Sequence, residues 1–396
     1  MTLSRLAIEE TARIDWDVIV LGAGPAGALG ARRLAMAGAR VLLVEKKEFP
    51  RRKVCGACLN ADALGVLASE GLGTLVDDQG GVVLREFHLG LGGRSIRLPL
   101  PAGRALSRAR FDLALVEEAI RSGVDFLPET LASVDADAGL AGGRAVRLDQ
   151  RGAAATAWAK VVVVAAGIGH HALERDPAIK TRVAPGSRIG AGCTVDDFPA
   201  DYGSGVIHMA VGRQGYVGLV RLEDGRLNVG AAFDRALVRQ MGEPGRAGAR
   251  VLEEAGFPRI AGLEAAAWQG TPGLTRRARP VAGRRLILIG DAAGYVEPFT
   301  GQGMACALAS AQAAAPIILR GLDSWSAALE RAWSTQHDAL LGRRYWLCRA
   351  LAAALRRPII ARSLFACAAW TPTVSRMMIH HVNKPHIFVE TSASCP

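Results

Sequence analysis

A glycine-rich hexapeptide near the N-terminus has the spacing of a phosphate-binding turn. It reads Gly-Ala-Gly-Pro-Ala-Gly and lies between an apolar run, DVIVLG, and a stretch rich in helix-forming residues. In such a turn the first glycine permits the tight bend, the second lets the backbone approach a pyrophosphate, and the third packs the helix against the strand. The helix N-terminus stabilises the phosphate charge. We therefore predict that a dinucleotide contacts Gly22, Gly24, Pro25, Ala26 and Gly27.

An acidic residue follows the second apolar run of this unit. Glu45 comes directly after VLLV, 18 residues beyond Gly27. A carboxylate at this point can accept hydrogen bonds from both ribose hydroxyls of an ADP moiety. The strand, helix, strand and acid together fill about 30 residues, the size of one βαβ unit. A bare GxGxxG also occurs in other α/β proteins, but in this setting it indicates a dinucleotide site.

A second motif distinguishes a flavin from a nicotinamide cofactor. Residues 290–294, GDAAG, follow an apolar run, and residues 298–303, PFTGQG, come shortly after. Asp291 at the end of a strand suits a ribityl hydroxyl. Gly301 and Gly303 precede a predicted helix, so backbone amides can approach the pyrimidine edge of a flavin, and the helix dipole favours its anionic reduced form. We therefore predict noncovalently bound FAD.

These motifs resemble the flavoprotein superfamily that joins geranylgeranyl reductases, aromatic hydroxylases of the para-hydroxybenzoate type and flavin-dependent halogenases. The resemblance covers roughly residues 15–310 and implies FAD held by GxGxxG and Glu45. It also implies an arginine that opens a helix in the pattern RxxFDxxL, here Arg108, which can bond the flavin side chain or its phosphates. In the later motif it implies Asp291 on the ribityl chain and Pro298 near the isoalloxazine. The flavin contacts predicted in that motif are Asp291, Pro298, Gly301, Gly303 and Met304.

Residues 53–59, KVCGACL, resemble the CGGGL-type segment of geranylgeranyl reductases, which lies near the flavin in those proteins. The resemblance implies that Cys55 and Gly56 adjoin the flavin and makes Cys55 a candidate catalytic residue. Residues 300–303, TGQG, are similar to their TGEG, although aromatic hydroxylases often carry GQG. Residues 215–220, GYVGLV, resemble the start of their GYxWxFP strand without its Trp and Pro. The WxWxIP signature of halogenases is absent, so the chain is most similar to the geranylgeranyl-reductase-like branch.

Two features leave the redox partners open. Family members usually carry Asp-Gly after the strand written here as VVVVAAG, and this chain has Ala166 in place of that Asp, which is associated with FAD and NADPH contacts. We expect NAD(P)H as electron donor, with NADH, NADPH and ferredoxin undecided. Cys55 and Cys58 form a CxxC pair with two possible interpretations. They are a redox dithiol beside the flavin, or one is the cysteine of the family segment and the other is an incidental thiol. No further ligands follow at metal-site spacing, so no metal is predicted.

The elements that position these motifs follow from the hydrophobic pattern. Continuous apolar runs at 158–167 and 284–294 predict strands of a parallel sheet, and helices are expected at about 107–122 and 304–320. Residues 186–275 contain alternating segments and a turn at 223–225, which predict antiparallel hairpins. The predicted fold class is α/β (α+β overall): a Rossmann-like FAD-binding domain (15–75, 100–170 and 276–320), an inserted antiparallel β-rich substrate domain (76–99 and 171–275) and a basic helical C-terminal region (321–396).

Composition limits both the class of protein and its cellular location. The chain has 396 residues and is 50% hydrophobic, as in ordinary globular proteins. Its seven cysteines are too sparse for a disulfide framework, its N-terminus lacks the apolar core of a signal peptide, and its longest apolar stretch, 305–319, is shorter than the roughly 20 residues of a membrane span. We therefore predict a cytoplasmic protein.

The net charge of +11 is unevenly distributed, since residues 339–389 contain no Asp or Glu. Three interpretations of this basic segment remain open: its residues form a solvated helix face, they contact an anionic membrane surface peripherally, or they bind an acidic partner. No nucleic-acid recognition motif accompanies it, so no nucleic-acid partner is predicted.

Three functions remain open at this stage. The first is reduction of a C=C bond of a lipophilic small molecule by hydride transfer. The second is NAD(P)H-dependent hydroxylation of an aromatic or polyketide-type lipid. The third is electron transfer to a protein partner, and halogenation ranks low. No nucleophile or acid–base pair stands out in the sequence, which is typical of enzymes whose cofactor carries the chemistry. The pattern indicates neither the particular substrate nor the oligomeric state.

Overall fold

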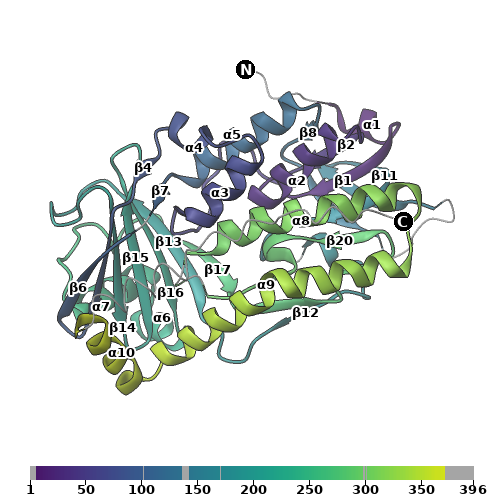
Figure 1. The fold of residues 1–396 in the computed structure, drawn as a ribbon. Coiled ribbons are helices and arrows are strands. Elements are labelled where there is room, and N and C mark those ends of the chain that lie inside the picture. Colours follow the sequence, from purple (N-terminus) through teal and green to yellow (C-terminus); the bar gives the residue numbers. More distant parts are fainter. Residues whose placement is uncertain are drawn as a thin grey trace.

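The computed structural model describes residues 6–100, 102–135, 142–169, 171–297, 299 and 301–370. Two large sheets occupy opposite ends of the molecule, and the long C-terminal helix α9 runs from one to the other (Figure 1). This is the predicted arrangement of a Rossmann-like FAD-binding domain, a β-rich insertion and a helical C-terminal region. The predicted fold class is therefore confirmed.

The first sheet has a parallel core, as the continuous apolar runs predict. Its order is β19-β20-β11-β1-β2-β8, and β10 and β9 extend it beside β11. Val18, Ile19 and Val20 of β1 have no exposed surface, since helices or further strands cover both faces. The strands are β1 (Asp15–Leu21), β2 (Val41–Val44), β8 (Asp125–Leu127), β9 (Leu131–Val134), β10 (Arg144–Gln150), β11 (Ala153–Val164), β19 (Ala282–Gly283) and β20 (Leu286–Leu288).

Helices α2 (Pro25–Met36), α5 (Arg108–Arg121) and α8 (Gly303–Asp323) form a packed layer on this sheet, with α3 (Ala61–Ser69) against α8. Among the described residues, α8 is the one helix long and apolar enough to cross a membrane, and it extends beyond the 305–319 stretch judged too short from the sequence. Its most apolar window is 72% buried inside the protein. The helix is therefore part of the hydrophobic core.

The second sheet is mainly antiparallel and has the order β17-β13-β16-β15-β14-β5-β6. β15 and β16 form the hairpin predicted around residues 223–225, whereas β14 and β5 pair in parallel across more than a hundred residues of sequence. Helices α6 (Arg235–Met241) and α7 (Pro244–Ala255) belong to this part, and α7 packs on β14 and β15. The strands are β5 (Glu86–Leu91), β6 (Arg94–Pro99), β13 (Ile189–Val195), β14 (Val206–Gly212), β15 (Gly215–Arg221), β16 (Leu227–Phe233) and β17 (Gln269–Gly273).

Two further sheets have three strands each. One joins β3 (Cys58–Asn60), β7 (Gly103–Ala105) and β4 (Val82–Val83), and the other joins β12 (Lys180–Val183), β18 (Arg276–Arg279) and β21 (Gly294–Tyr295). Short helices α1 (Ile8–Thr11) and α4 (Leu75–Asp78) and 3-10 turns at His171–Leu173 and Gly290–Ala292 complete the description. The boundaries of the three predicted regions stay a prediction.

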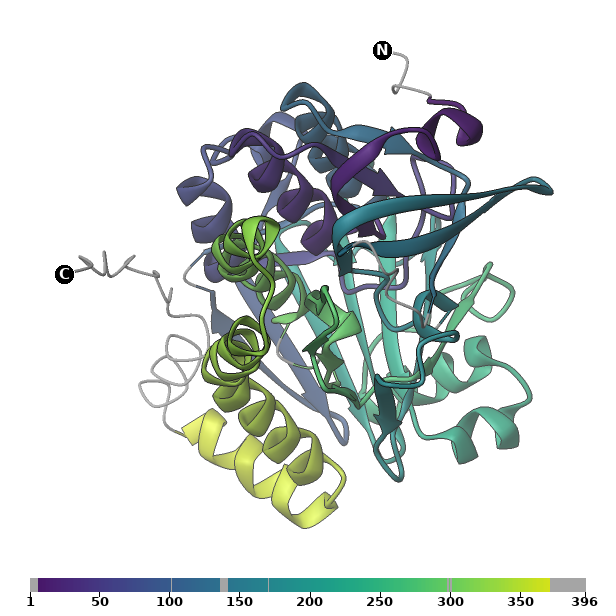
Figure 2. The ribbon, with the colours of Figure 1, turned by 90° about the vertical axis from the view of Figure 1, so that its right-hand side faces the viewer.

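The C-terminal region is helical, as predicted, through residue 370. α9 (Ala327–Leu355) is anchored on the first sheet, where Trp333 donates a hydrogen bond to the Leu288 carbonyl (3.1 Å). Pro358 begins α10 (Pro358–Trp370), because proline fits the first turn of a helix but not its interior. Figure 2 shows α9 and α10 along one side of the molecule. Residues 371–396 lie outside the described residues.

Candidate active site

The glycine-rich turn has a geometry that only glycine satisfies at two positions. Gly22 adopts φ +103°, and a Cβ there would lie 2.6 Å from the Ala165 carbonyl oxygen. A Cβ on Gly27 would overlap the Gly22 carbonyl oxygen, so this glycine allows α2 to pack against β1. Gly24 is the N-cap of α2 and Pro25 begins the helix, which leaves the first helical amides directed away from the sheet. These features suit an anion at the helix N-terminus.

Glu45 lies at the mouth of this turn, directly after β2. Its carboxylate accepts hydrogen bonds from the Ala23 amide (3.0 Å) and the Lys47 amide (3.2 Å), and the side chain is nearly buried. The Arg51 guanidinium lies 3.3 Å from the same carboxylate. The backbone therefore orients Glu45 beside the position predicted for a ribose.

Two guanidinium groups lie over the N-terminus of α2. Arg108 holds Asp112 through two hydrogen bonds of 2.7 Å, and Arg51 contacts the same carboxylate at 3.0 Å. Their terminal nitrogens lie 3.7 and 3.8 Å from the position that a Cβ on Gly24 would occupy. Burial is the largest single influence and would lower the pKa of Arg108, but Asp112 and Cys55 together outweigh it and the pKa is raised, so the group stays charged. Two cations above a helix N-terminus suit a pyrophosphate.

Arg51 is a residue that the sequence analysis missed. No motif includes it, because its position depends on the path of the chain after β2, where residues 46–57 form no regular strand or helix. The run Arg51-Arg52-Lys53, close behind Glu45, was the available signal. The structure brings Arg51 into contact with Glu45 and next to Arg108, whereas Arg52 points to Thr194 (2.9 Å).

Asp291 is in the 3-10 turn that follows β20, at the carboxyl edge of the parallel sheet. Gly290 before it adopts φ +58° and donates its amide to the Ser310 hydroxyl (2.8 Å). Burial raises the pKa of Asp291, and the positive charges of Lys53 and Arg108 oppose that rise. The carboxylate thus lies close enough to the arginine site for the charges to interact.

Lys53 was also missed as a site residue. Its ammonium nitrogen is 2.9 Å from the position of a Cβ on Gly167, directly after the Ala166 that replaces the usual acid. Burial lowers the pKa of Lys53, Arg108 lowers it further, and Asp291 acts in the opposite direction. Lys53 therefore places a titratable amine between the glycine-rich turn and Asp291.

The second glycine-rich segment leads into α8. Gly301 adopts φ +67° with open space at its Cβ position, and Gly303 is the first residue of the helix. Met304 is buried in the core. The Tyr295 ring lies 3.6 Å from the Cβ position of Gly303, and Pro298 lies outside the described residues.

Cys55 lies between the cofactor motifs and the second sheet. Its carbonyl oxygen accepts a hydrogen bond from the Asn228 amide of β16 (3.0 Å), and its thiol helps to raise the pKa of Arg108. Cys58 has a free thiol that donates to the Gly56 carbonyl (3.1 Å), and burial raises the pKa of Cys58 strongly. Gly56 is exposed with open space around it. The two cysteines therefore have different environments.

A cavity of about 50 Å³ opens between the Cys55 segment and the second sheet. It is lined by Arg52, Lys53 and Arg108 on one side and by Thr194 and Asn228 on the other. This cavity connects the predicted cofactor site to the face of the β-rich insertion.

An apolar cluster extends from this region across the same face of the sheet. Burial raises the pKa of Tyr295 well above its usual range, and the nearby groups Asp291, Cys55 and Tyr216 act in the same direction. Tyr295 therefore joins the cofactor residues to the rest of the cluster. The cluster is built from Phe87, Leu89, Leu91, Ile168, Met209, Val211, Tyr216, Ala232, Leu274, Tyr295, Phe299 and Leu355.

The predicted site residues that the structure describes thus fall into one set of neighbouring contacts. The glycine turn, Glu45 and Arg108 meet at one end, and Asp291, Cys55 and Gly303 each lie near Tyr295 at the other. These residues fit FAD, because a positively charged helix N-terminus and a backbone-oriented carboxylate suit an ADP moiety. The role of each individual residue stays a prediction.

Comparison with known proteins supports FAD as the cofactor. Residues 15–172 match the family described as FAD binding domain. The chain is 28% identical over 377 residues to menaquinone reductase of Mycolicibacterium smegmatis, which covers 86% of this chain and 85% of the relative. It is 26% identical to digeranylgeranylglycerophospholipid reductase 2 of Methanopyrus kandleri, covering 84% of each chain.

Solved structures share the fold over nearly the whole chain. The flavin-dependent brominase Bmp2 has a TM-score of 0.75 at 19% identity and covers 93% of this chain and 94% of its own. The p-nitrophenol 4-monooxygenase PnpA of Pseudomonas putida has a TM-score of 0.73 at 18% identity, covering 93% and 98%. Fold and site define a flavoenzyme with FAD as its cofactor. The chain thus carries an FAD-binding domain over residues 15–172, is similar in sequence to proteins named menaquinone reductase and digeranylgeranylglycerophospholipid reductase, and shares its fold with a flavin-dependent brominase and a monooxygenase.

Proposed function

We propose that the protein is a reductase that saturates a C=C bond of a lipophilic small molecule by hydride transfer. The observation that carries the proposal is the apolar cluster around Tyr216 and Phe299, which adjoins the cofactor residues through Tyr295. A pocket for a lipophilic ligand is usually lined by apolar side chains with few polar groups, and this cluster supplies side chains of that kind. The relatives named menaquinone reductase and digeranylgeranylglycerophospholipid reductase support this reaction class.

Bound FAD would supply the two-electron chemistry, with NAD(P)H as the donor that reduces it. The chain's own residues then have three tasks. Arg51 and Arg108 hold the pyrophosphate, Asp291 orients the ribityl chain, and the apolar cluster positions the substrate and excludes water. The Cys55 thiol, next to Arg108, is the side chain we assign to proton supply or to shaping of the reaction site.

Hydroxylation is the second candidate, favoured by one feature, the Gln302 of the TGQG segment, which aromatic hydroxylases often carry. Stopped-flow mixing of the anaerobically reduced enzyme distinguishes the two reactions. A reductase reoxidises slowly in oxygen and quickly with an unsaturated lipid substrate. A hydroxylase reacts quickly with oxygen in the presence of an aromatic substrate, and that result would reject the proposed reduction.

Substitution of the two cysteines tests the role assigned to Cys55. Cys55→Ser should retain FAD and lose at least tenfold in turnover, because a hydroxyl is a far weaker acid than a thiol at neutral pH. Cys58→Ser is the matched control and should keep normal turnover, since the Cys58 thiol is hydrogen-bonded to Gly56. Equal losses in both variants, with a disulfide detected by mass spectrometry, would show instead that the cysteines act as a dithiol.

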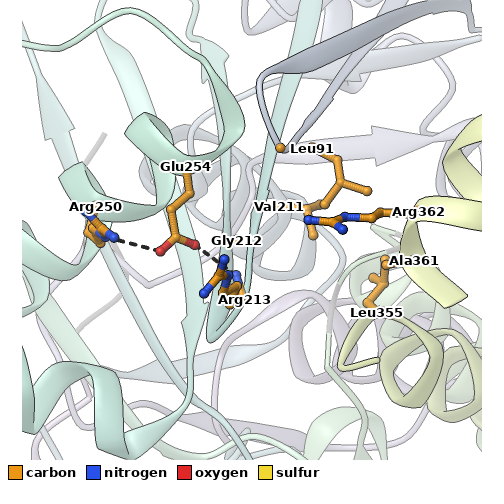
Figure 3. Close-up of a pocket in the computed structure, with 10 residues that line it drawn as sticks. Leu91, Val211, Gly212, Arg213, Arg250, Glu254, Leu355, Ala361 and Arg362 are labelled. Carbon is orange, nitrogen blue, oxygen red and sulfur yellow. Dashed lines mark hydrogen bonds and ion pairs between the residues drawn. The ribbon is translucent and has the colours of Figure 1, made fainter. Parts of the chain in front are cut away.

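We also propose that the enzyme works in the cytoplasm at the surface of an anionic membrane. Trp346 and Ile359 on α9 and α10 are 70% and 81% exposed, and no Asp or Glu occurs between residues 339 and 370. A cavity of about 200 Å³ opens beside these helices (Figure 3), and Arg362 extends across it toward Val211 and Leu91. The exposed large apolar side chains on α9 and α10 are Trp346, Leu347, Ile359, Ile360 and Leu364.

Charge complementarity selects anionic lipid as the partner of this surface. Each basic residue near an anionic bilayer contributes about 1 kcal/mol, and exposed apolar side chains add burial in the interface. Leu91, Val211 and Leu355 line the cavity and also belong to the apolar cluster, so the cavity offers a lipid a route toward the cofactor site.

Vesicle co-sedimentation tests the membrane contact. Phosphatidylglycerol vesicles should retain the enzyme at low salt, with weaker retention at high salt and little on phosphatidylcholine. Ile359→Asp should reduce retention several-fold, whereas Leu131→Asp, an exposed apolar residue on β9, should not. Equal retention on anionic and neutral vesicles would reject the anionic membrane as the partner. So would a dimer that forms without lipid and is lost in Ile359→Asp.

A further inference from the structure

A group of buried charged residues lies beside the apolar cluster and outside every motif. Arg188, before β13, is 1% exposed, and Glu297, after β21, is 2% exposed. Glu297 is 3.5 Å from Arg188 and 2.5 Å from Arg356 at the end of α9, and Arg188 donates a hydrogen bond to Asp234 (3.1 Å). Two guanidinium groups thus face two carboxylates, and the group carries no net charge.

Three hydrogen-bond donors of this region have no partner among the described residues: the hydroxyl of Tyr216, which is 3% exposed, Nη2 of Arg188 and Nε of Arg356. One acceptor, Oε2 of Glu297, also lacks a hydrogen bond and lies 3.5 Å from Nη1 of Arg188. The Arg188 guanidinium lies 5.6 Å from the centre of the Tyr216 ring, so the donors of Tyr216 and Arg188 belong to one place. A buried donor without an acceptor is unfavourable, and native proteins rarely keep one. A ligand that supplies an acceptor oxygen accounts for the unpaired donors of Tyr216 and Arg188.

The chemistry of the donors specifies the ligand atom. A guanidinium only donates, and burial together with Glu297 raises the pKa of Tyr216 well above its usual range, so its hydroxyl keeps its proton. The ligand must therefore present an acceptor oxygen. Because the charges of the group already balance, a phosphate would be a buried charge without compensation, which is unfavourable, whereas a neutral carbonyl adds no charge.

We propose that Tyr216 and Arg188 bind a neutral carbonyl oxygen on the polar head of the substrate. The enzyme then takes a lipophilic quinone or ketone in preference to a phosphorylated lipid or a plain hydrocarbon. This inference rests on the proposed function, because it assigns the adjoining cluster to the apolar part of the same substrate. Phe299 packs edge-on against Tyr216 (5.2 Å) and holds the ring that carries the donor.

Two tyrosine variants provide a test that separates binding from folding. Tyr216→Phe removes only a hydroxyl that has no protein partner, so the Tm of the FAD-loaded enzyme should stay constant or rise. Its Kd for a short-chain menaquinone, measured by flavin absorbance with the oxidised enzyme, should increase about tenfold. Tyr202→Phe is the control, because the Tyr202 hydroxyl donates to the Pro258 carbonyl (2.6 Å). It should lower Tm and leave the Kd unchanged.

The ligand panel distinguishes the possible head groups. Geranylgeranyl diphosphate and a hydrocarbon of equal chain length should bind wild type more weakly than the quinone, and Tyr216→Phe should not alter their Kd. The inference is overturned if the quinone binds wild type and Tyr216→Phe equally, or if only the diphosphate binds. These measurements involve no turnover, so a quinone that binds through Tyr216 without any C=C reduction would reject the proposed function and keep the carbonyl site.

Discussion

Arg51 provides the sharpest test of how this chain holds FAD. Its guanidinium joins Glu45 (3.3 Å) and Asp112 (3.0 Å) and lies above Gly24 at the N-terminus of α2. Arg51→Met removes the charge and keeps the length of the side chain. Both acids retain partners, since Asp112 keeps its two bonds to Arg108 and Glu45 keeps two backbone amides. The fold should therefore survive the substitution.

The magnitude follows from the charges around the pyrophosphate. A charge pair at 4 Å is worth about 4 kcal/mol at an effective dielectric constant of 20, but Arg51 is already shared between Glu45 and Asp112. The value of one charge-assisted hydrogen bond, about 1.5–3 kcal/mol, is therefore more appropriate. Arg51→Met should raise the Kd for FAD by about ten- to 150-fold.

Titration of FAD into flavin-free protein, followed by quenching of flavin fluorescence, measures this effect. Arg52→Met is the matched control, because Arg52 is adjacent in sequence but bonds Thr194 instead of the acids around the glycine-rich turn. Its Kd should change less than about threefold. The reasoning fails if Arg51→Met binds FAD like the wild type, or if Arg52→Met loses as much affinity as Arg51→Met. Thermal unfolding of the flavin-free variants checks that the apoprotein is intact.

Three other predictions concern single residues. Glu45→Gln should retain markedly less FAD on purification, since it loses the charge of the acceptor; equal flavin occupancy would contradict the ribose assignment. Asp291→Asn should shift the flavin spectrum or weaken FAD retention with an unchanged circular dichroism spectrum. Burial and the neighbouring His88 lower the pKa of His208 to about 4, so protonation favours the unfolded chain. The free energy of unfolding should fall by about 3 kcal/mol between pH 6.5 and 4, and His208→Phe should remove much of this dependence in urea titrations.

The parts of the fold that sequence predicted well are those with local signals. The glycine-rich turn, the helix that begins at Pro25 and the buried run of β11 each depend on a few adjacent residues. The hairpin of β15 and β16 was predicted from alternation and a turn. By contrast, the parallel pairing of β14 with β5 joins residues 206–211 to 86–91, and nothing local encodes that partnership.

The site residues also fall into two groups: those with a local sequence signal, which were predicted, and those that depend on long-range contacts, which were not. Gly22, Glu45 and Asp291 were found because cofactor binding uses the backbone at strand ends, which fixes both residue type and spacing. Arg51, Lys53 and Arg188 were not found, since each acts on a group that the chain brings close only after folding. Salt bridges such as Arg188–Glu297 join positions more than a hundred residues apart. Sequence motifs therefore identified the cofactor, and tertiary contacts were needed to suggest the substrate.

Strand β15 departs from the family pattern at one position, and that position bears on substrate specificity. Where GYxWxFP carries tryptophan, this chain has Gly218, and the Met209 methyl group lies 3.3 Å from the Cβ position there. Gly218 pairs with Gly230, whose own Cβ position is 3.1 Å from the Cys55 carbonyl. Neither glycine contributes a side chain to the sheet between Tyr216 and Cys55, and the Met209 side chain covers the position of the family's tryptophan. The surface beside Tyr216 therefore differs from the family pattern, while the cofactor motifs that hold FAD lie elsewhere in the sequence.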